Sequence, residues 1–268
     1  MDDPHLVEAF VLRKEKFHCP VEIIYSFHGF QLTLKEHILN KIDKILFLSN
    51  LGYQSSKDNF FAFIPEVHII GNCVDSKHFF PLDDIEKNKM KESLGYVQKD
   101  KILIWMANER PIKGFQLFKK IIITLFKKHP KLRILILGSK KKIDHPNIKN
   151  IGRLPNDQIA KYLQVGDYYM FTSLCKEGFG LSMIEALKTG NTVIASNNGA
   201  IEEVLKGNKN VFLVDDPNML DNWIQVFDQA FKVEKTNLLL EEANTVWNYE
   251  DWEKRFIKAI RQSSYEID

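Results

Sequence analysis

Short apolar runs recur along the whole chain, and longer stretches with a helical period separate them. The runs are rich in β-branched and aromatic side chains and contain few polar positions. They lie at 21–27, 44–49, 67–70, 101–106, 132–138, 167–171, 192–196 and 211–214. A run that is apolar almost throughout is typical of a strand covered on both faces, as in parallel sheets. The pattern therefore predicts buried strands at these places.

Between these runs, apolar residues return every three or four positions, which is the period of a helix with one buried face. The period is clearest at 115–130, where Pro130 marks the stop, and at 181–190, where Gly190 stands at the place of a C-terminal cap. Strands that alternate with helices indicate an α/β fold with right-handed crossovers. We therefore expect parallel sheets flanked by helices.

The most polar window of the chain, 83–100, divides this pattern in two. It follows Pro81, contains Gly95 and ends in a charged turn, as expected of a helix that leads into a linker. The predicted parts are a first unit at 1–96, a second unit at 97–232 and C-terminal helices at 233–268. The aromatic residues of the last part are expected to dock on one of the two bodies; they are Trp247, Trp252 and Phe256.

Composition narrows the functional classes. The 268 residues carry a net charge of only +2, so the chain lacks the basic excess expected of a nucleic-acid-binding protein. Its three cysteines are scattered without a CxxC spacing, which fits a reducing compartment and no disulfide framework. No stretch approaches the roughly 20 apolar residues of a spanning helix, and the acidic start is not a signal peptide. We expect a cytoplasmic protein that binds no nucleic acid.

The segment KEGFGLSMIEAL (176–187) sets two carboxylates, Glu177 and Glu185, on either side of a Gly-Phe-Gly turn. It follows a predicted strand and opens a predicted helix, so it lies where open α/β sheets bind ligands. The two glycines let the backbone approach a ligand closely, and the first helical amides form an anion site. Glu185 suits a diol such as a ribose. On spacing alone, the alternative stays open that both carboxylates are ordinary solvated charges.

A resemblance to a known family begins at this segment. EGFGLSMIEALKTGNTVIASNNGAIEEV resembles the E-x7-E signature of the GT4 family of GT-B glycosyltransferases. Other segments, all earlier in the chain, resemble further motifs of that family in the family's order. The segment YSFHG (25–29) resembles the one whose histidine faces the cleft in the family. Residues 106–122 resemble the phosphate loop, 132–139 the next strand, and 147–173 the nucleotide-base loop with the strand before the acid motif. The resemblance covers roughly 20–262.

The resemblance implies a GT-B-like α/β fold with two Rossmann-like parallel-sheet domains, the N-terminal one incomplete. It also implies a retaining glycosyltransferase that moves a sugar from a UDP- or GDP-sugar to a glycan or a lipid-linked saccharide, without a metal. Such an enzyme would be cytoplasmic, either free or peripheral at the inner face of a membrane. The residues carried over as catalytic are Glu177, His28 and Lys113. Those carried over as donor-binding are Asn108, Arg110, Lys113, Gly152, Arg153, Leu154, Gly178, Phe179, Gly180, Leu181 and Glu185.

Three departures from the family pattern matter. Counted back from Lys113, Asn108 occupies the position where the family's phosphate loop usually has an arginine. Arg110 lies two residues later. Asn72-Cys73 replaces an Asn-Gly turn of the family. Met1 falls about midway through the first domain of a complete member, so we expect either a natural short form or a fragment. The sheet edge opened in this way predicts self-association or an exposed apolar surface, because the C-terminal helices alone would cover it only in part.

Two other functions compete with the enzyme. One is a catalytically weak or non-catalytic partner that keeps the nucleotide-sugar site, and measurable transfer or donor hydrolysis would separate it from the enzyme. The other is a Rossmann dehydrogenase, which the sequence disfavours because no GxGxxG follows any predicted strand.

Overall fold

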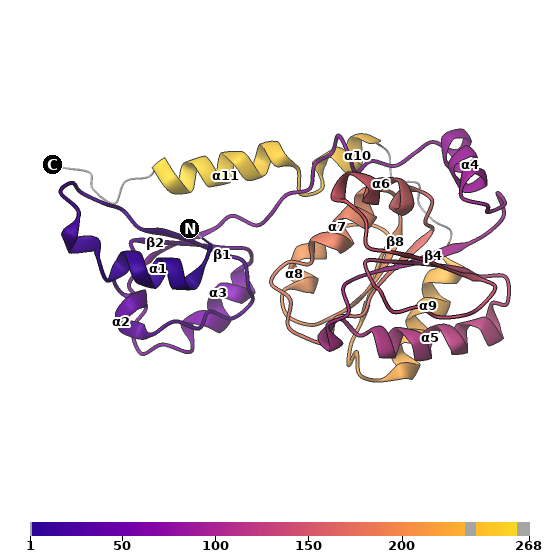
Figure 1. Ribbon diagram of the computed structural model, residues 1–268, viewed down its shortest axis with the longest axis horizontal. Helices are drawn as coiled ribbons and strands as arrows, with labels where there is room; N and C mark the ends of the chain where they lie inside the picture. The colour runs from indigo at the N-terminus through magenta and orange to yellow at the C-terminus, as the bar shows by residue number, and fades with distance from the viewer. Residues whose placement is uncertain (1, 234–239, 262–268) are drawn as a thin grey trace.

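The computed structural model describes residues 2–233 and 240–261, which form two bodies side by side (Figure 1). The sheet of the first body is parallel and has the order β1-β2-β3. Its strands are β1 (Ile24–Phe27), β2 (Lys44–Phe47) and β3 (Glu66–Ile69). The edges of this sheet are β1 and β3. Pairing of one of these edges with a second copy of the chain stays a prediction.

Side chains of the first sheet alternate between its two faces. Tyr25 and Phe47 share a buried cluster with α1 (Pro4–Val11) and α2 (Glu36–Leu39). Leu46 belongs to a cluster on the other face, together with Ala259, Trp252 and Phe256 of α11 (Tyr249–Arg261). Figure 1 shows α11, drawn in yellow, beside the first body although it is far from it in the sequence. The last helix described therefore supplies part of the first body's core.

The sheet of the second body is also parallel, with the order β6-β5-β4-β7-β8-β9. In chain order its strands are β4 (Ile102–Met106), β5 (Arg133–Leu137), β6 (Ile148–Gly152), β7 (Tyr168–Phe171), β8 (Thr192–Ser196) and β9 (Val211–Val214). Numbered within this body, the order is 3-2-1-4-5-6, that of a doubly wound dinucleotide-binding sheet. The order reverses between β4 and β7, which is where such sheets bind ligands.

Helices cover both faces of the second sheet. Trp105 of β4 packs on one face with Phe118 of α5 (Phe115–Lys128) and Phe227 of α9 (Leu220–Lys232). On the other face, Tyr169 of β7 packs with Met183 of α7 (Leu181–Lys188). The same cluster draws residues from α6 (Asn156–Gln164) and α8 (Ile201–Leu205). The second body is thus a helix–sheet–helix sandwich.

The α/β fold predicted from the sequence is confirmed, and a strand is found at each of the expected places. The helices expected at 115–130 and 181–190 end at Lys128 and Lys188. One strand, β6, was missed. Its sequence, IKNIG, is interrupted by Lys149 and Asn150, and Lys149 is exposed, so it lacks a nearly continuous apolar run.

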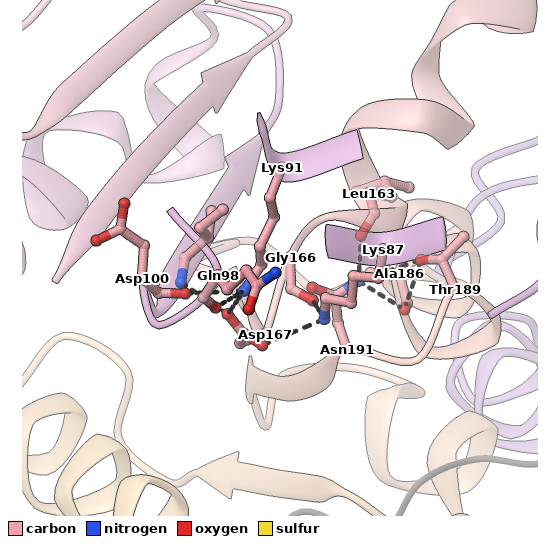
Figure 2. A network of polar contacts seen from close by, with 11 residues as sticks. Lys87, Lys91, Gln98, Asp100, Leu163, Gly166, Asp167, Ala186, Thr189 and Asn191 are labelled. Carbon is pink, nitrogen blue, oxygen red and sulfur yellow. Dashed lines mark hydrogen bonds and ion pairs between the residues drawn. The ribbon is translucent and has the colours of Figure 1, made fainter. Parts of the chain in front are cut away.

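Helix α4 (Asp84–Ser93) packs on the second body, although the sequence placed it in the first unit. Figure 2 shows the buried polar network that holds it. The Asp167 carboxylate pairs with the amines of Lys87 at 3.2 Å and Lys91 at 3.3 Å. The Lys91 amine also donates to the Asp100 carbonyl at 2.8 Å, and burial lowers the pKa of this amine. The packing therefore places the change of body before α4 rather than at residue 96.

The chain crosses between the bodies twice, and Lys188 ties both crossings to α7. Its fully buried amine donates to the Ser76 hydroxyl at 3.0 Å on the first crossing. On the second it donates to the carbonyls of Ala243, in α10 (Leu240–Thr245), at 2.7 Å and Val246 at 2.8 Å. Burial lowers the pKa of this amine to about 8.

Among the described residues, no helix is both long and apolar enough to traverse a bilayer.

Cys73, which replaces the glycine of the family's Asn-Gly turn, lies on the first crossing, and a nearby glycine adopts the left-handed conformation there. The left-handed residue there is Gly71, with φ of 68°, and a Cβ on it would lie 2.5 Å from the Trp247 ring. Cys73 itself has no positive φ; its amide donates to the Asn72 side chain at 2.9 Å. The glycine that the crossing requires is therefore present, two positions earlier than the cysteine.

Candidate functional site

A cavity of about 480 Å³ opens at the carboxyl ends of β4, β5 and β7, beside the point where the strand order reverses. Six of the predicted donor-binding residues line it together: Asn108, Lys113, Arg153, Leu154, Leu181 and Glu185. The other lining residues are Met106, Ala107, Leu137, Gly138, Asn156, Ile159, Phe171 and Ser182. All of them belong to the second body, so the cavity is complete without the first.

Glu177 and Lys113, both predicted to be catalytic, form a largely buried ion pair at the edge of this cavity. The Lys113 amine lies 2.5 Å from Oε1 of Glu177, and the Ser173 hydroxyl donates to the same oxygen at 2.5 Å. The backbone of Glu177 is fixed as well, because its carbonyl accepts from Ala200 at 2.9 Å. The structure therefore joins the phosphate loop to the acid motif through a single carboxylate.

Lys113 closes the short helix η2 (Pro111–Lys113), and two buried residues hold its backbone in place. The Trp105 indole donates to the Thr172 hydroxyl at 2.8 Å, and that hydroxyl donates to the Lys113 carbonyl at 2.9 Å. The next residue, Gly114, has φ of 75°, and a Cβ there would lie 2.1 Å from the Thr172 carbonyl oxygen. Only glycine fits this close approach between the phosphate loop and the end of β7.

Asn108 and Arg110 are hydrogen-bonded to each other in the loop after β4. Oδ1 of Asn108 accepts from the Arg110 amide at 3.1 Å and from its Nε at 3.3 Å. Asn108 lines the cavity, while Arg110 lies behind it and is exposed. The asparagine at the family's arginine position thus holds a guanidinium beside the cavity.

The wall of the cavity that is predicted to hold the base includes the turn after β6. Gly152, with φ of 82°, accepts from the Gly138 amide at 2.7 Å, which brings this turn against the end of β5. Arg153 is largely exposed and its guanidinium lies 3.6 Å from the Glu109 carboxylate. Arg153 and Leu154 both line the cavity, and the expectation that a base packs on their backbone stays a prediction.

Helix α7 begins at the cavity without a side-chain cap. Gly180 is its N-cap residue, with φ of 81°, so its first amides are left for a ligand. Ser182, in the first turn, lies 2.9 Å from the Tyr169 hydroxyl, which is 3.2 Å from the Met106 carbonyl. Phe179 is 3% exposed and packs edge-on against Trp247, so only its backbone is available to a ligand.

Glu185 lies one turn further along α7 and lines the cavity. Burial raises the pKa of its carboxyl to about 7. Within the part of the chain that the structure describes, its carboxyl has no hydrogen bond or ion pair to offset this burial. A buried acid without a protein partner is poised for a ligand that donates hydrogen bonds, such as a diol.

His28 belongs to the first body and is exposed, with its Nε2 3.1 Å from the Ser26 hydroxyl. Its neighbour Gly29 touches the acid motif: a Cβ on Gly178 would lie 2.5 Å from the Gly29 carbonyl oxygen. The amine of Lys176 lies over the Phe30 ring at 5.6 Å. The histidine segment and the acid motif therefore meet, while the expected place of His28 beside the transferred sugar stays a prediction.

Sequence reasoning missed several side chains of the site. Ser182 could have been found from its helix, since it lies three positions before Glu185 on the same face. Asn156, the first residue of α6, and Phe171, at the end of β7, gave no such signal. In residues 2–233 and 240–261, no group of three or more histidine, cysteine or acidic side chains is placed to hold a metal ion.

Comparison with known proteins identifies the family. The model of the family described as glycosyl transferases group 1 matches residues 86–245, which is more than half of the chain. The chain belongs to this family. It is 25% identical over 217 residues to the GPI3 subunit of phosphatidylinositol N-acetylglucosaminyltransferase from Saccharomyces cerevisiae, covering 75% of this chain. The match covers 45% of that relative, so the chain spans less than half of it.

A bacterial relative and two solved structures extend the comparison. N-acetyl-alpha-D-glucosaminyl L-malate synthase from Bacillus anthracis is 24% identical over 256 residues, which cover 87% of this chain and 63% of that protein. A glycosyltransferase from Rickettsia africae superposes with a TM-score of 0.75 at 20% identity, over 94% of this chain and 74% of that one. Anabaena Alr3699/HepE in complex with UDP gives 0.71 at 16% identity, over 97% and 76%. These likenesses confirm the predicted GT-B-like fold.

Proposed function

We propose that this chain binds a nucleoside diphosphate sugar in the cavity of the second body and transfers the sugar to an acceptor. One observation carries the proposal: the phosphate loop, the uncapped start of α7 and the partnerless acid Glu185 line a single cavity. These are the groups that a diphosphate and a ribose require. The solved structure of HepE holds UDP, which supports the same ligand class for this fold.

The diphosphate would lie between Lys113 and the first amides of α7, with Arg110 as a second cation. As the sugar leaves, negative charge develops on the diphosphate, and fixed positive groups lower the energy of that transition state. The Lys113 backbone is held by Thr172, so its charge is preorganised. We propose that these groups carry the charge without a metal cofactor, which predicts unchanged transfer in the presence of a chelator.

The nucleoside would extend along the other wall of the cavity. Glu185 would accept hydrogen bonds from the ribose hydroxyls, and the base would lie on the backbone at Arg153–Leu154, where a uracil or guanine ring is expected. The transferred sugar would then reach the edge of the cavity, near Glu177. Glu177 and His28 would contact it from the two bodies, and we infer transfer with retention at the anomeric carbon.

The acceptor is proposed from the relatives' names. The yeast relative is a subunit of a phosphatidylinositol glycosyltransferase, and a relative from Propionibacterium freudenreichii is named a phosphatidyl-myo-inositol mannosyltransferase. These names favour a lipid-linked acceptor over a soluble glycan. A lipid-linked acceptor would give the protein a peripheral position at the cytoplasmic face of a membrane.

Calorimetry with UDP and GDP tests donor binding directly, and a transfer and hydrolysis assay with nucleotide sugars tests catalysis. We expect binding of one of the two diphosphates by the folded protein in low-salt buffer. The absence of binding by either would refute the proposal. Binding without transfer or hydrolysis would instead identify a non-catalytic nucleotide-sugar-binding partner.

A further inference from the structure

The two bodies meet at a second contact near the acid motif. The Glu203 carboxylate, in α8 of the second body, spans the gap to α3 (Asn50–Lys57) of the first body. One carboxylate oxygen accepts from the Asn50 amide at 2.7 Å and the other from the Leu51 amide at 2.8 Å. The amides at the start of a helix lack partners within it and carry partial positive charge, so a carboxylate is a fitting partner for them.

Glu203 is not required to cap α3. The hydroxyl of Ser49, within the first body, already accepts from the Gly52 amide at 3.1 Å as the side-chain cap of this helix. The two amides that Glu203 binds lie at the exposed end of the helix, and Glu203 itself is exposed. The contact therefore adds a connection between the bodies, and water can replace it when they separate.

The contact is connected to Glu177 through a short path. Helix α8 begins after Ala200, whose amide donates to the Glu177 carbonyl at 2.9 Å. Gly199 pairs with Glu177 as an isolated parallel bridge, and a Cβ on Gly199 would lie 2.5 Å from the Glu177 amide nitrogen. The segment that carries Glu203 is thus fixed to the backbone of the predicted catalytic acid.

We propose that Glu203 is a positioning residue: by binding the start of α3 it holds the first body against the acid motif and sets His28 toward the transferred sugar. The inference rests on the proposed function. It also accounts for the division of the site, because the donor cavity belongs to the second body alone while His28 comes from the first. Loss of the contact should therefore impair transfer and leave donor binding intact.

The test compares Glu203→Gln and Glu203→Ala with the matched change Glu202→Gln, one residue earlier on the exposed side of α8. We expect kcat for transfer to fall by about 100-fold in both Glu203 variants, as for a misplacement of about 1 Å. The dissociation constant for UDP or GDP should stay within about twofold, and Glu202→Gln should match the wild type in both. Equal kcat in all variants, or a parallel loss of donor affinity, would overturn the proposal.

Ser49→Ala separates positioning from simple loss of α3 stability. It removes the cap of α3 inside the first body and leaves Glu203 bound to Asn50 and Leu51. We expect it to lower thermal stability and to retain kcat where the protein is folded. A fall in kcat as large as in Glu203→Gln would mean that α3 stability alone matters, and would overturn the proposal.

Small-angle scattering gives a readout that does not need activity. The radius of gyration of Glu203→Gln should exceed that of the wild type and of Glu202→Gln, because the bodies separate more often. Identical scattering of the three proteins would refute the contact's role even if no transfer could be measured. A wild type that binds no nucleotide would refute the proposed function, while the scattering result would still stand on its own.

Discussion

The amine of Lys113 lies 2.5 Å from Oε1 of Glu177, so two residues predicted to be catalytic form an ion pair with each other. A bound diphosphate would compete with Glu177 for this amine. Donor binding would then free the carboxylate at the place where the sugar is expected. We therefore expect occupation of the predicted phosphate site to release the Glu177 carboxylate from Lys113.

Lys113→Ala should weaken the binding of a nucleoside diphosphate much more than that of the nucleoside. A hydrogen bond to a charged group contributes about 1.5–3 kcal/mol, so the expected loss in diphosphate affinity is about 10- to 100-fold. Calorimetry with both ligands measures the difference. Lys119→Ala, an exposed lysine on α5, is the matched control and should bind like the wild type. Equal losses for nucleoside and diphosphate would contradict a phosphate contact.

Glu185→Ala and Glu177→Ala should affect different kinetic constants. Glu185 is expected to hold the ribose in the ground state and the transition state alike, so its loss should mainly raise the dissociation constant of the donor. Glu177 lies where the sugar changes charge, so its loss should mainly lower turnover. Binding and single-turnover measurements on both variants test the division. Similar effects of the two changes on binding, with turnover of bound donor intact, would refute it.

The stability of the wild type should fall as pH rises toward neutrality. Burial raises the pKa of Glu185 to about 7, whereas the unfolded chain releases this proton near the ordinary value. Between these two values the folded state binds a proton that the unfolded state lacks, so stability decreases with pH and levels off above about 7. Each unit of the pKa difference corresponds to about 1.4 kcal/mol. Denaturation curves of wild type and Glu185→Gln should converge below about pH 5 and diverge above it, with the wild type losing more.

Donor affinity should depend on pH through the same group but in the opposite direction. Ribose hydroxyls bind the carboxylate more strongly than the protonated acid, so affinity should rise up to about pH 7 and then level off. A nucleotide sugar is the suitable ligand because its bridging diphosphate does not titrate in this range. Glu185→Gln should show a flat profile; a slope equal to that of the wild type would assign the titration to another group.

Thr172→Val should loosen the phosphate loop. The change keeps the shape of the side chain but leaves the Trp105 indole and the Lys113 carbonyl without their partner. Leaving a buried polar group unsatisfied costs about 1–3 kcal/mol, which chemical denaturation would detect. Diphosphate affinity should fall as well, while Thr172→Ser, which keeps the hydroxyl, should retain both. Unaltered affinity in Thr172→Val would show that Lys113 is held by other contacts.

The sequence predicted every described strand except β6, together with helices α5 and α7, because buried strands and amphipathic helices carry strong periodic patterns. Strand β6 lacked that pattern, since Lys149 and Asn150 interrupt its apolar residues. The six cavity residues were predicted through family motifs, whose order along the chain implies the loops at one sheet edge. No pattern within 83–100 could show that Lys87 and Lys91 pair with Asp167, because such a pairing exists only after the sheet has formed.

The contact between Glu203 and α3 was beyond sequence reasoning for the same reason. Glu203 follows Glu202 on the exposed side of α8, and nothing in their neighbourhood distinguishes the one that reaches α3. The pairing of Arg110 with Asn108 also depends on a loop conformation that the sequence leaves open. The partners that polar side chains find in the folded protein are thus the part of the site that only the structure reveals.

The place of α11 has a consequence for the order of events during synthesis. Leu46 leaves the ribosome long before Trp252 and Phe256, the residues that cover its side of the first sheet. Multidomain chains generally fold from the N-terminus as they emerge. Here the strands of the second sheet all lie between residues 102 and 214, so that sheet has its full set of strands while the first still exposes an apolar face. The first body is synthesised before the second but is therefore completed after it, and nascent chains should occupy chaperones until α11 has been made.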